Sequence, residues 1–140
     1  MTRQEIVAFF ARRLDLTARH DAVGLAALHA EDCVVESPWV GTVRGREAIE
    51  QVARQWFKSF PDFVFQGEEL LIDGNRAAQM ATVVGTDIGG FMGLPPTGKP
   101  FRIPRVFLYT LNEHQIVHER RIYDFTGMLV QIGVLKAKPA

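Results

Sequence analysis

The sequence is poor in several features that would point to a particular class of protein. It contains one cysteine, Cys33, in 140 residues, so an intramolecular disulfide and a cysteine-based zinc site are both excluded. Its 16 basic residues balance 16 acidic ones, and this lack of a basic surplus argues against nucleic-acid binding. No apolar run approaches a membrane span, and the N-terminal segment has no signal-peptide pattern. We therefore expect a cytoplasmic protein with neither a nucleic-acid nor a membrane partner.

What the chain does contain favours one folded domain over residues 1–140. The apolar fraction is 47%, which is enough for a substantial core, and neither an internal repeat nor a domain boundary is visible. His20, His29 and His114 show no ligand spacing and fall on predicted helices or a turn. They are predicted to be surface residues, and no metal or other cofactor is expected.

Helices are predicted in the first half of the chain. Thr2 and Glu5 form a capping-box pattern ahead of a helical repeat of apolar residues. Asp21 is placed to cap a second, short helix. A third helix begins after Gly45 and must end by Pro61, because proline disfavours the helical conformation of the residue before it.

Strands dominate the second half and define the predicted fold. They are expected at residues 33–37, 63–72, 76–86, 101–110 and 115–123, with a strong hairpin signal at Asp73-Gly74-Asn75. Helices followed by antiparallel strands indicate an α+β fold in which the N-terminal helices pack on one face of a strongly curved sheet. We expect a cone-shaped α+β barrel whose open end forms a pocket.

Several residues are candidates for lining this pocket. In the strand at 101–110, Arg105 and Tyr109 share a face, and Pro104 on the other face suggests a bulge or an edge. Residues 87–100 are too rich in glycine and proline for regular structure but carry apolar side chains, which is typical of a lid or rim. The candidate walls are Trp39, Trp56, Phe60, Phe91 and Met92.

The end of the last predicted strand is the most promising place for chemistry. Asp124 stands between this strand and an apolar helix, where it is either the helix N-cap or a carboxylate acid or base. Alternation places Arg120, Ile122 and Asp124 on one face, together with His118 and Ile116. An inward Arg120 would favour an anionic ligand; alternatively it pairs with Glu36 or Asp87 on neighbouring strands.

Two motifs give the chain a family resemblance. They are Gly93-Leu94-Pro95-Pro96-Thr97-Gly98 and the ending Asp124-x-x-Gly127-Met128-Leu129-x-Gln131-Ile132-Gly133. With the order of elements, they resemble the SnoaL-like polyketide cyclases of the ketosteroid-isomerase-like, nuclear-transport-factor-2-like superfamily. The resemblance implies that Asp124 is the general acid/base of an intramolecular aldol closure, with no cofactor. The chain departs from the family pattern at Asp87, where histidine is common, and at Arg120.

Other members of the superfamily suggest alternatives. The position of the ketosteroid isomerase base is taken by Ser37 here, which disfavours that mechanism. An epoxide hydrolase or a dehydratase remains open, although the Arg-x-Asp pair of the epoxide hydrolases is missing. The main hypothesis is a small cyclase or isomerase that acts on an apolar, polyketide-like carbonyl compound. The others are a non-catalytic binder of such a ligand and an interaction protein, and a homodimer through the sheet face is expected.

Overall fold

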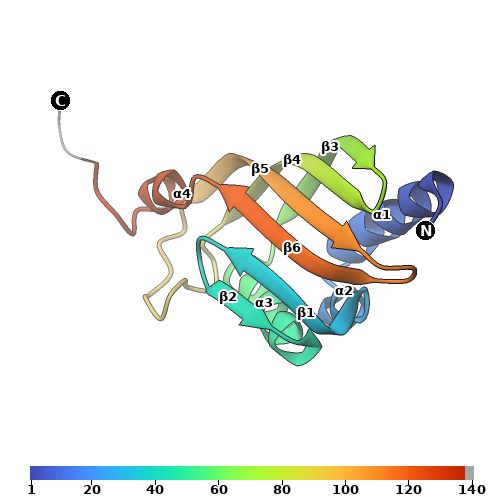
Figure 1. Ribbon diagram of the computed structural model, residues 1–140. Coiled ribbons are helices and arrows are strands. Elements are labelled where there is room, and N and C mark those ends of the chain that lie inside the picture. Colours follow the sequence, from blue (N-terminus) through green and yellow to red (C-terminus); the bar gives the residue numbers. More distant parts are fainter. Residues whose placement is uncertain (138–140) are drawn as a thin grey trace.

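The computed structural model describes residues 1–137 and has the α+β fold expected from the sequence. Ten helices and strands are found in this part of the chain (Figure 1). They are α1 (Arg3–Ala18), α2 (Ala22–Ala27), β1 (His29–Ser37), β2 (Gly41–Arg44), α3 (Arg46–Ser59), β3 (Val64–Asp73), β4 (Arg76–Thr86), β5 (Pro100–Leu111), β6 (Ile116–Tyr123) and α4 (Phe125–Gln131).

The six strands form one curved sheet in the order β2-β1-β6-β5-β4-β3. All neighbouring strands are antiparallel except β1 and β6, which run parallel. Helices α1, α2 and α3 lie on one side of this sheet, and β2 and β3 are its two edges, so it does not close (Figure 1). The expected arrangement of helices on a strongly curved, mostly antiparallel sheet is thus confirmed. In residues 1–137 no helix is long and apolar enough to span a membrane.

Local sequence signals account for most element boundaries. The Thr2–Glu5 capping box is formed at the start of α1, and Asp21 caps α2 by accepting a hydrogen bond from the Gly24 backbone. The sequence does not predict strand β2, because its four residues begin at Gly41, are followed by Gly45 and resemble a loop. Pro104 lies in the part of β5 that does not pair with β6, because the last β5–β6 pair is Arg105 with Tyr123.

An irregularity in β6 decides which side chains face inward. The β5–β6 register shifts so that Thr110 pairs with His118 but Leu111 pairs with Ile116, which leaves Val117 as an extra residue. The strand therefore presents Ile116 inward at one end and Glu119, Arg121 and Tyr123 inward beyond the bulge, while His118, Arg120 and Ile122 face outward. The predicted grouping of Ile116 with Arg120 on one face is wrong, because uninterrupted alternation was assumed.

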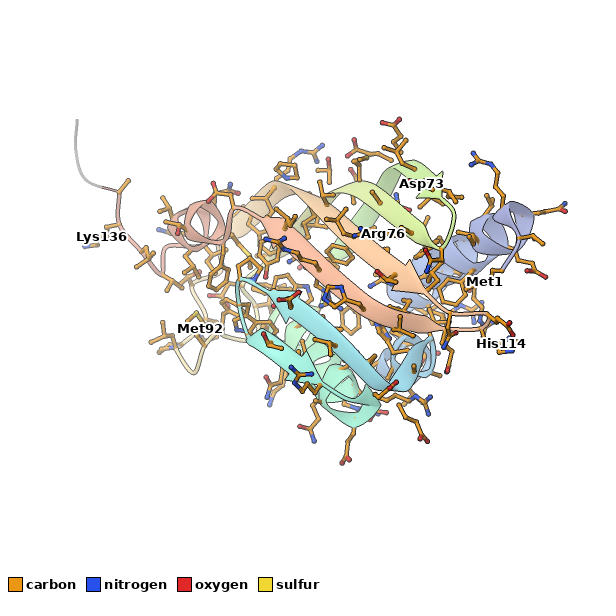
Figure 2. The ribbon with its side chains drawn as sticks, in the orientation of Figure 1. Met1, Asp73, Arg76, Met92, His114 and Lys136 are labelled. Atoms are coloured by element: carbon orange, nitrogen blue, oxygen red, sulfur yellow. The ribbon has the colours of Figure 1, made fainter. Side chains whose placement is uncertain are left out.

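The loop at residues 87–99 is held by its own hydrogen bonds and packs against α3 and the aromatic core. Asp87 is fully buried and accepts hydrogen bonds from the Gly90 backbone N–H and from the backbone N–H and hydroxyl of Thr97. Gly89 lies so close to α3 that a Cβ there would stand 1.9 Å from the Lys58 carbonyl oxygen. Phe91 is buried in the aromatic core, whereas Met92 is 53% exposed and lies on the loop beside the α4 end of the molecule (Figure 2).

Candidate binding and active site

A cavity of about 50 Å³ lies between the inner face of the sheet and the helices. Its walls are largely aromatic, and its charged residues are all arginines, so neither a carboxylate nor an imidazole is in direct contact with it. The lining residues are Arg13, Thr17, Leu25, Ser37, Trp39, Val52, Ala53, Trp56, Phe57, Phe63, Phe65, Arg105, Phe107, Arg121 and Tyr123. The cavity therefore differs from the carboxylate-centred pocket that the sequence predicts.

Arg105 is the central polar residue of this cavity. It projects inward from β5, is 5% exposed, and has its guanidinium carbon 4.0 Å from the ring centre of Tyr123 and 4.5 Å from that of Trp56. Its Nε and Nη2 have no hydrogen-bond partner within residues 1–137. Burial lowers the pKa of Arg105 to about 10, so the side chain is still charged at neutral pH.

The neighbouring charges are organised differently, around Glu119. This carboxylate is completely buried and accepts hydrogen bonds from His29 Nε2 (2.9 Å) and from Arg121 Nε, with Arg13 Nη2 at 3.9 Å. Burial alone would raise the pKa of Glu119, but Arg121, Arg13 and His29 outweigh it and hold that pKa well below its usual range. Glu119 is therefore an ionised partner for these cations and is not suited to donate a proton.

His29 has an acceptor at each ring nitrogen. Nδ1 lies 3.0 Å from the Leu25 carbonyl oxygen, while Nε2 lies 2.9 Å from Glu119 Oε1. The ring thus links α2 to the buried carboxylate on β6. The sequence predicts His29 as a surface residue, and this is wrong, because His29 is 1% exposed.

Further buried donors near the cavity lack partners within residues 1–137. They are Arg13 Nε, Trp56 Nε1 and the Tyr109 hydroxyl. Burial raises the pKa of Tyr109, which stays a neutral phenol. Such groups are costly to bury unless something accepts their hydrogen bonds. In the same part of the chain, no group of three or more histidine, cysteine, aspartate or glutamate side chains is arranged to hold a metal.

The residues predicted at the end of β6 are not among those that line the cavity. Asp124 is exposed and is the N-cap of α4, where its Oδ1 accepts a hydrogen bond of 2.9 Å from the Gly127 backbone. Arg120 is exposed on the outer face of the sheet. Asp124 directly follows Tyr123, whose ring does line the cavity. A catalytic role for Asp124 stays a prediction, while its capping role is observed.

The other predicted residues divide between the cavity and its surroundings. Trp39, Trp56 and Arg105 line the cavity, and Phe60 and Phe91 pack in the aromatic core around Trp56. Tyr109 packs on Phe10, with its ring centre 4.6 Å away, and does not contact the cavity. Asp87 holds the loop, and its carboxylate is occupied by the hydrogen bonds described above.

Trp39 lines both the cavity and a second, larger hollow. It lies on the turn between β1 and β2 and packs against Trp56 and Phe91, with ring centres 5.5 and 5.2 Å apart. The second hollow is a groove of about 530 Å³ that runs between α3 and the 87–99 loop and includes Met92. Trp39 is thus a shared wall, and Met92 belongs to the outer groove.

Several inward residues were not predicted from the sequence. Arg13, Glu119, Arg121 and Tyr123 are inward-facing, and His29 lies behind them. The available signal was the period-two spacing of Glu119, Arg121 and Tyr123, which places them on one face of β6.

Comparisons with known proteins agree with this fold. The family model described as SnoaL-like polyketide cyclase matches residues 8–132. Comparison with curated proteins gave no match. Among solved structures, IdmH from Streptomyces antibioticus, named as a candidate polyketide cyclase, is 28% identical, with 91% of this chain and 97% of that chain covered and a TM-score of 0.77.

Two other solved structures are more distant in sequence. A protein of ketosteroid isomerase-like fold from Catenulispora acidiphila is 20% identical, with 85% of this chain and 88% of that chain covered and a TM-score of 0.72. TerC, co-crystallised with polyporic acid, is 14% identical, with 91% and 97% covered and a TM-score of 0.75. The family match covers most of the chain, and the chain belongs to the SnoaL-like polyketide cyclase family.

Proposed function

We propose that this protein is a cyclase or isomerase that binds an aromatic carbonyl compound with its carbonyl group in the inner cavity. Membership of the SnoaL-like family suggests this type of function. Structures of the same fold have been crystallised with small molecules, TerC with polyporic acid and the C. acidiphila protein with trimethylamine. The observation that carries the proposal is Arg105, a buried cation with two unpartnered N–H groups in an aromatic-walled cavity.

The chemistry proposed is proton transfer next to a carbonyl group. A base removes the proton from the carbon alpha to the carbonyl, and the negative charge moves to the oxygen, which Arg105 receives through its N–H groups. In a cyclase, the enolate carbon then forms a bond to a second carbonyl carbon of the same molecule, and the resulting alkoxide takes a proton. Fixed donors in a site with little water can contribute about 3–4 kcal/mol to such a step.

Asp124 is proposed as the base. It is a carboxylate at the end of β6, it directly follows the cavity residue Tyr123 in the chain, and its Oδ2 accepts no hydrogen bond from residues 1–137. Asn at this position would still cap α4, because asparagine is as good an N-cap as aspartate. Asp124→Asn therefore removes the proposed base while keeping the helix start.

The test is the exchange of alpha protons for deuterium. Enolisation of bicyclic aromatic ketones such as 2-tetralone in D₂O is followed by proton NMR, so the natural substrate need not be known. We expect catalysed exchange that falls about 100-fold or more in Arg105→Met and in Asp124→Asn. Arg102→Met is the matched control, because Arg102 is exposed on the opposite face of the same strand.

Two results would count against this mechanism. Exchange by the wild-type protein at the rate of buffer alone would reject enolisation of these ketones, and undiminished exchange in Arg105→Met would reject the role of Arg105. Loss in Arg105→Met alone, with Asp124→Asn fully active, would move the base to another group.

A non-catalytic binder of the same ligand is the second candidate. It is favoured by one observation, the lack of a carboxylate or imidazole among the fifteen residues that line the cavity. A binder would take up aromatic compounds through Arg105 and Trp56 without accelerating exchange of any of them.

A further inference from the structure

We propose that the ligand is already an anion when it binds, a planar two-oxygen anion on an aromatic frame, with both oxygens on Arg105. A carboxylate and an ionised β-dicarbonyl group share this chemistry. The inference rests on the proposed function for the place where the ligand binds, and it adds the charge and shape of the group that Arg105 recognises.

The first argument is the balance of buried charge. Three arginines, the buried Arg13 and Arg105 and the largely buried Arg121, surround the cavity, and within residues 1–137 the one buried carboxylate beside them is Glu119. Both oxygens of Glu119 are in use, Oε1 by His29 and Oε2 by Arg121. No carboxylate in residues 1–137 forms an ion pair with Arg105. A buried cation without a counter-ion is strongly unfavourable, and an anionic ligand would remove this penalty.

The second argument is the geometry of the unused donors. Nε and Nη2 form one edge of the guanidinium group, and their hydrogens point in nearly the same direction. This edge binds two oxygens of one planar anion through two parallel hydrogen bonds. A simple ketone offers only one oxygen and would leave one of these donors unused. Stacking on Tyr123 and Trp56 fixes the plane of the group before any ligand arrives.

The third argument concerns the rest of the ligand. A cavity of about 50 Å³ has room for the anionic group but is much smaller than an apolar cavity of about 150 Å³ that is known to hold benzene. The frame must therefore extend beyond the cavity. Trp39 is the wall shared with the 530 Å³ groove, and a shift of its side chain would join the two spaces. We expect the frame to stack where Trp39 now packs against Trp56.

The experiment compares matched charged and neutral probes by isothermal titration calorimetry. The probes are 2-naphthoate, its neutral amide 2-naphthamide, and 2-acetyl-1,3-indanedione, which is ionised at neutral pH. We expect wild type to bind 2-naphthoate at least tenfold more tightly than the amide. This preference should vanish in Arg105→Met and persist in Arg102→Met. Tight binding of the indanedione but not of 2-naphthoate would indicate that the natural ligand is an ionised β-dicarbonyl compound. Tight binding of 2-naphthoate but not of the indanedione would indicate a carboxylate.

Further measurements keep the proposal falsifiable if Arg105→Met folds poorly. Arg105→Lys retains a charge but not the two-donor edge, so its preference for the anion should be reduced but present. Affinity of wild type for 2-naphthoate should fall as pH rises through about 10, where free Arg105 loses its proton. Equal binding of the naphthoate and the amide, or an unchanged preference in Arg105→Met, would overturn the proposal. Binding of inorganic phosphate without any binding of the aromatic anions would overturn it too.

These results separate the inference from the proposed function. If 2-naphthoate binds through Arg105 but no ketone undergoes exchange, the anion site stands and catalysis of enolisation fails. If exchange of neutral ketones depends on Arg105 but anions have no advantage in binding, the proposed function stands and the anion site fails.

Discussion

Two arginines on the same inner face of the sheet have opposite surroundings. Arg121 donates a hydrogen bond to the buried carboxylate of Glu119, which also binds His29. Arg105, on the next strand, has aromatic rings around it and unpartnered Nε and Nη2 atoms within residues 1–137. The first arrangement contributes to folding, because each charge has a partner inside the chain. The second costs stability, and a residue that is kept at such a cost is a good indication of ligand binding.

Removing the Glu119 carboxylate should destabilise the folded protein. Glu119→Gln leaves Arg13, Arg121 and His29 buried without their anion, so we expect the free energy of unfolding to fall by about 3–5 kcal/mol. Urea unfolding followed by circular dichroism measures this. A loss comparable to that of an exposed ion pair would show that the Glu119 cluster does not stabilise the fold.

The Glu119 carboxylate should also make the stability of the protein depend on pH. The pKa of Glu119 is lower in the folded protein than its ordinary value of 4.5, so its contribution is complete above that value and is lost as pH falls toward the folded-state pKa. We expect wild-type stability to drop below about pH 4.5 and the drop to be smaller in Glu119→Gln. Parallel pH profiles for the two proteins would contradict this assignment.

Replacing Arg105, the unpaired arginine, should have the opposite effect and raise the free energy of unfolding. In Arg105→Met, an apolar side chain of similar length takes the place of a buried cation, so the ligand-free protein should gain about 1–3 kcal/mol of stability. Thermal unfolding in ligand-free buffer measures the change, with Arg102→Met as the control near zero. A clear loss of stability would mean that Arg105 serves the fold, and the contrast with Arg121 would disappear.

The smallest effect is expected at an ion pair on the outer face. His118 and Glu36 approach to 2.8 Å, yet their side chains remain 41% and 46% exposed. Glu36→Gln should therefore change the free energy of unfolding by about 0.5 kcal/mol or less, because water already solvates both groups. A loss as large as that in Glu119→Gln would mean that burial does not distinguish the two pairs.

Much of the fold could be predicted from local signals. The Thr2 cap, the turn at Asp73-Gly74-Asn75 and the alternation in β5 each depend on neighbouring residues, and the sequence predicts all three correctly. Asp124 was recognised as a possible N-cap for the same reason. A homodimer through the outer sheet face stays a prediction.

The site was less predictable because it depends on contacts between distant parts of the chain. The extra residue Val117 in β6 changes which side chains face inward, and the neighbouring sequence carries no signal for it. His29 and Glu119 are ninety positions apart in the sequence, and they come into hydrogen-bond contact only when β1 pairs with β6. The register of β6 beyond Val117 places Arg120 outward. Arg105 was found because β5 alternates regularly, but its lack of a partner is a property of the folded molecule.

The most direct measurement is a crystal structure of the protein with 2-naphthoate. The account predicts that both carboxylate oxygens lie about 2.7–2.9 Å from Nε and Nη2 of Arg105, with the naphthalene rings extending toward a displaced Trp39. A naphthoate bound elsewhere, with the Nε and Nη2 edge of Arg105 facing only solvent or protein, would contradict it.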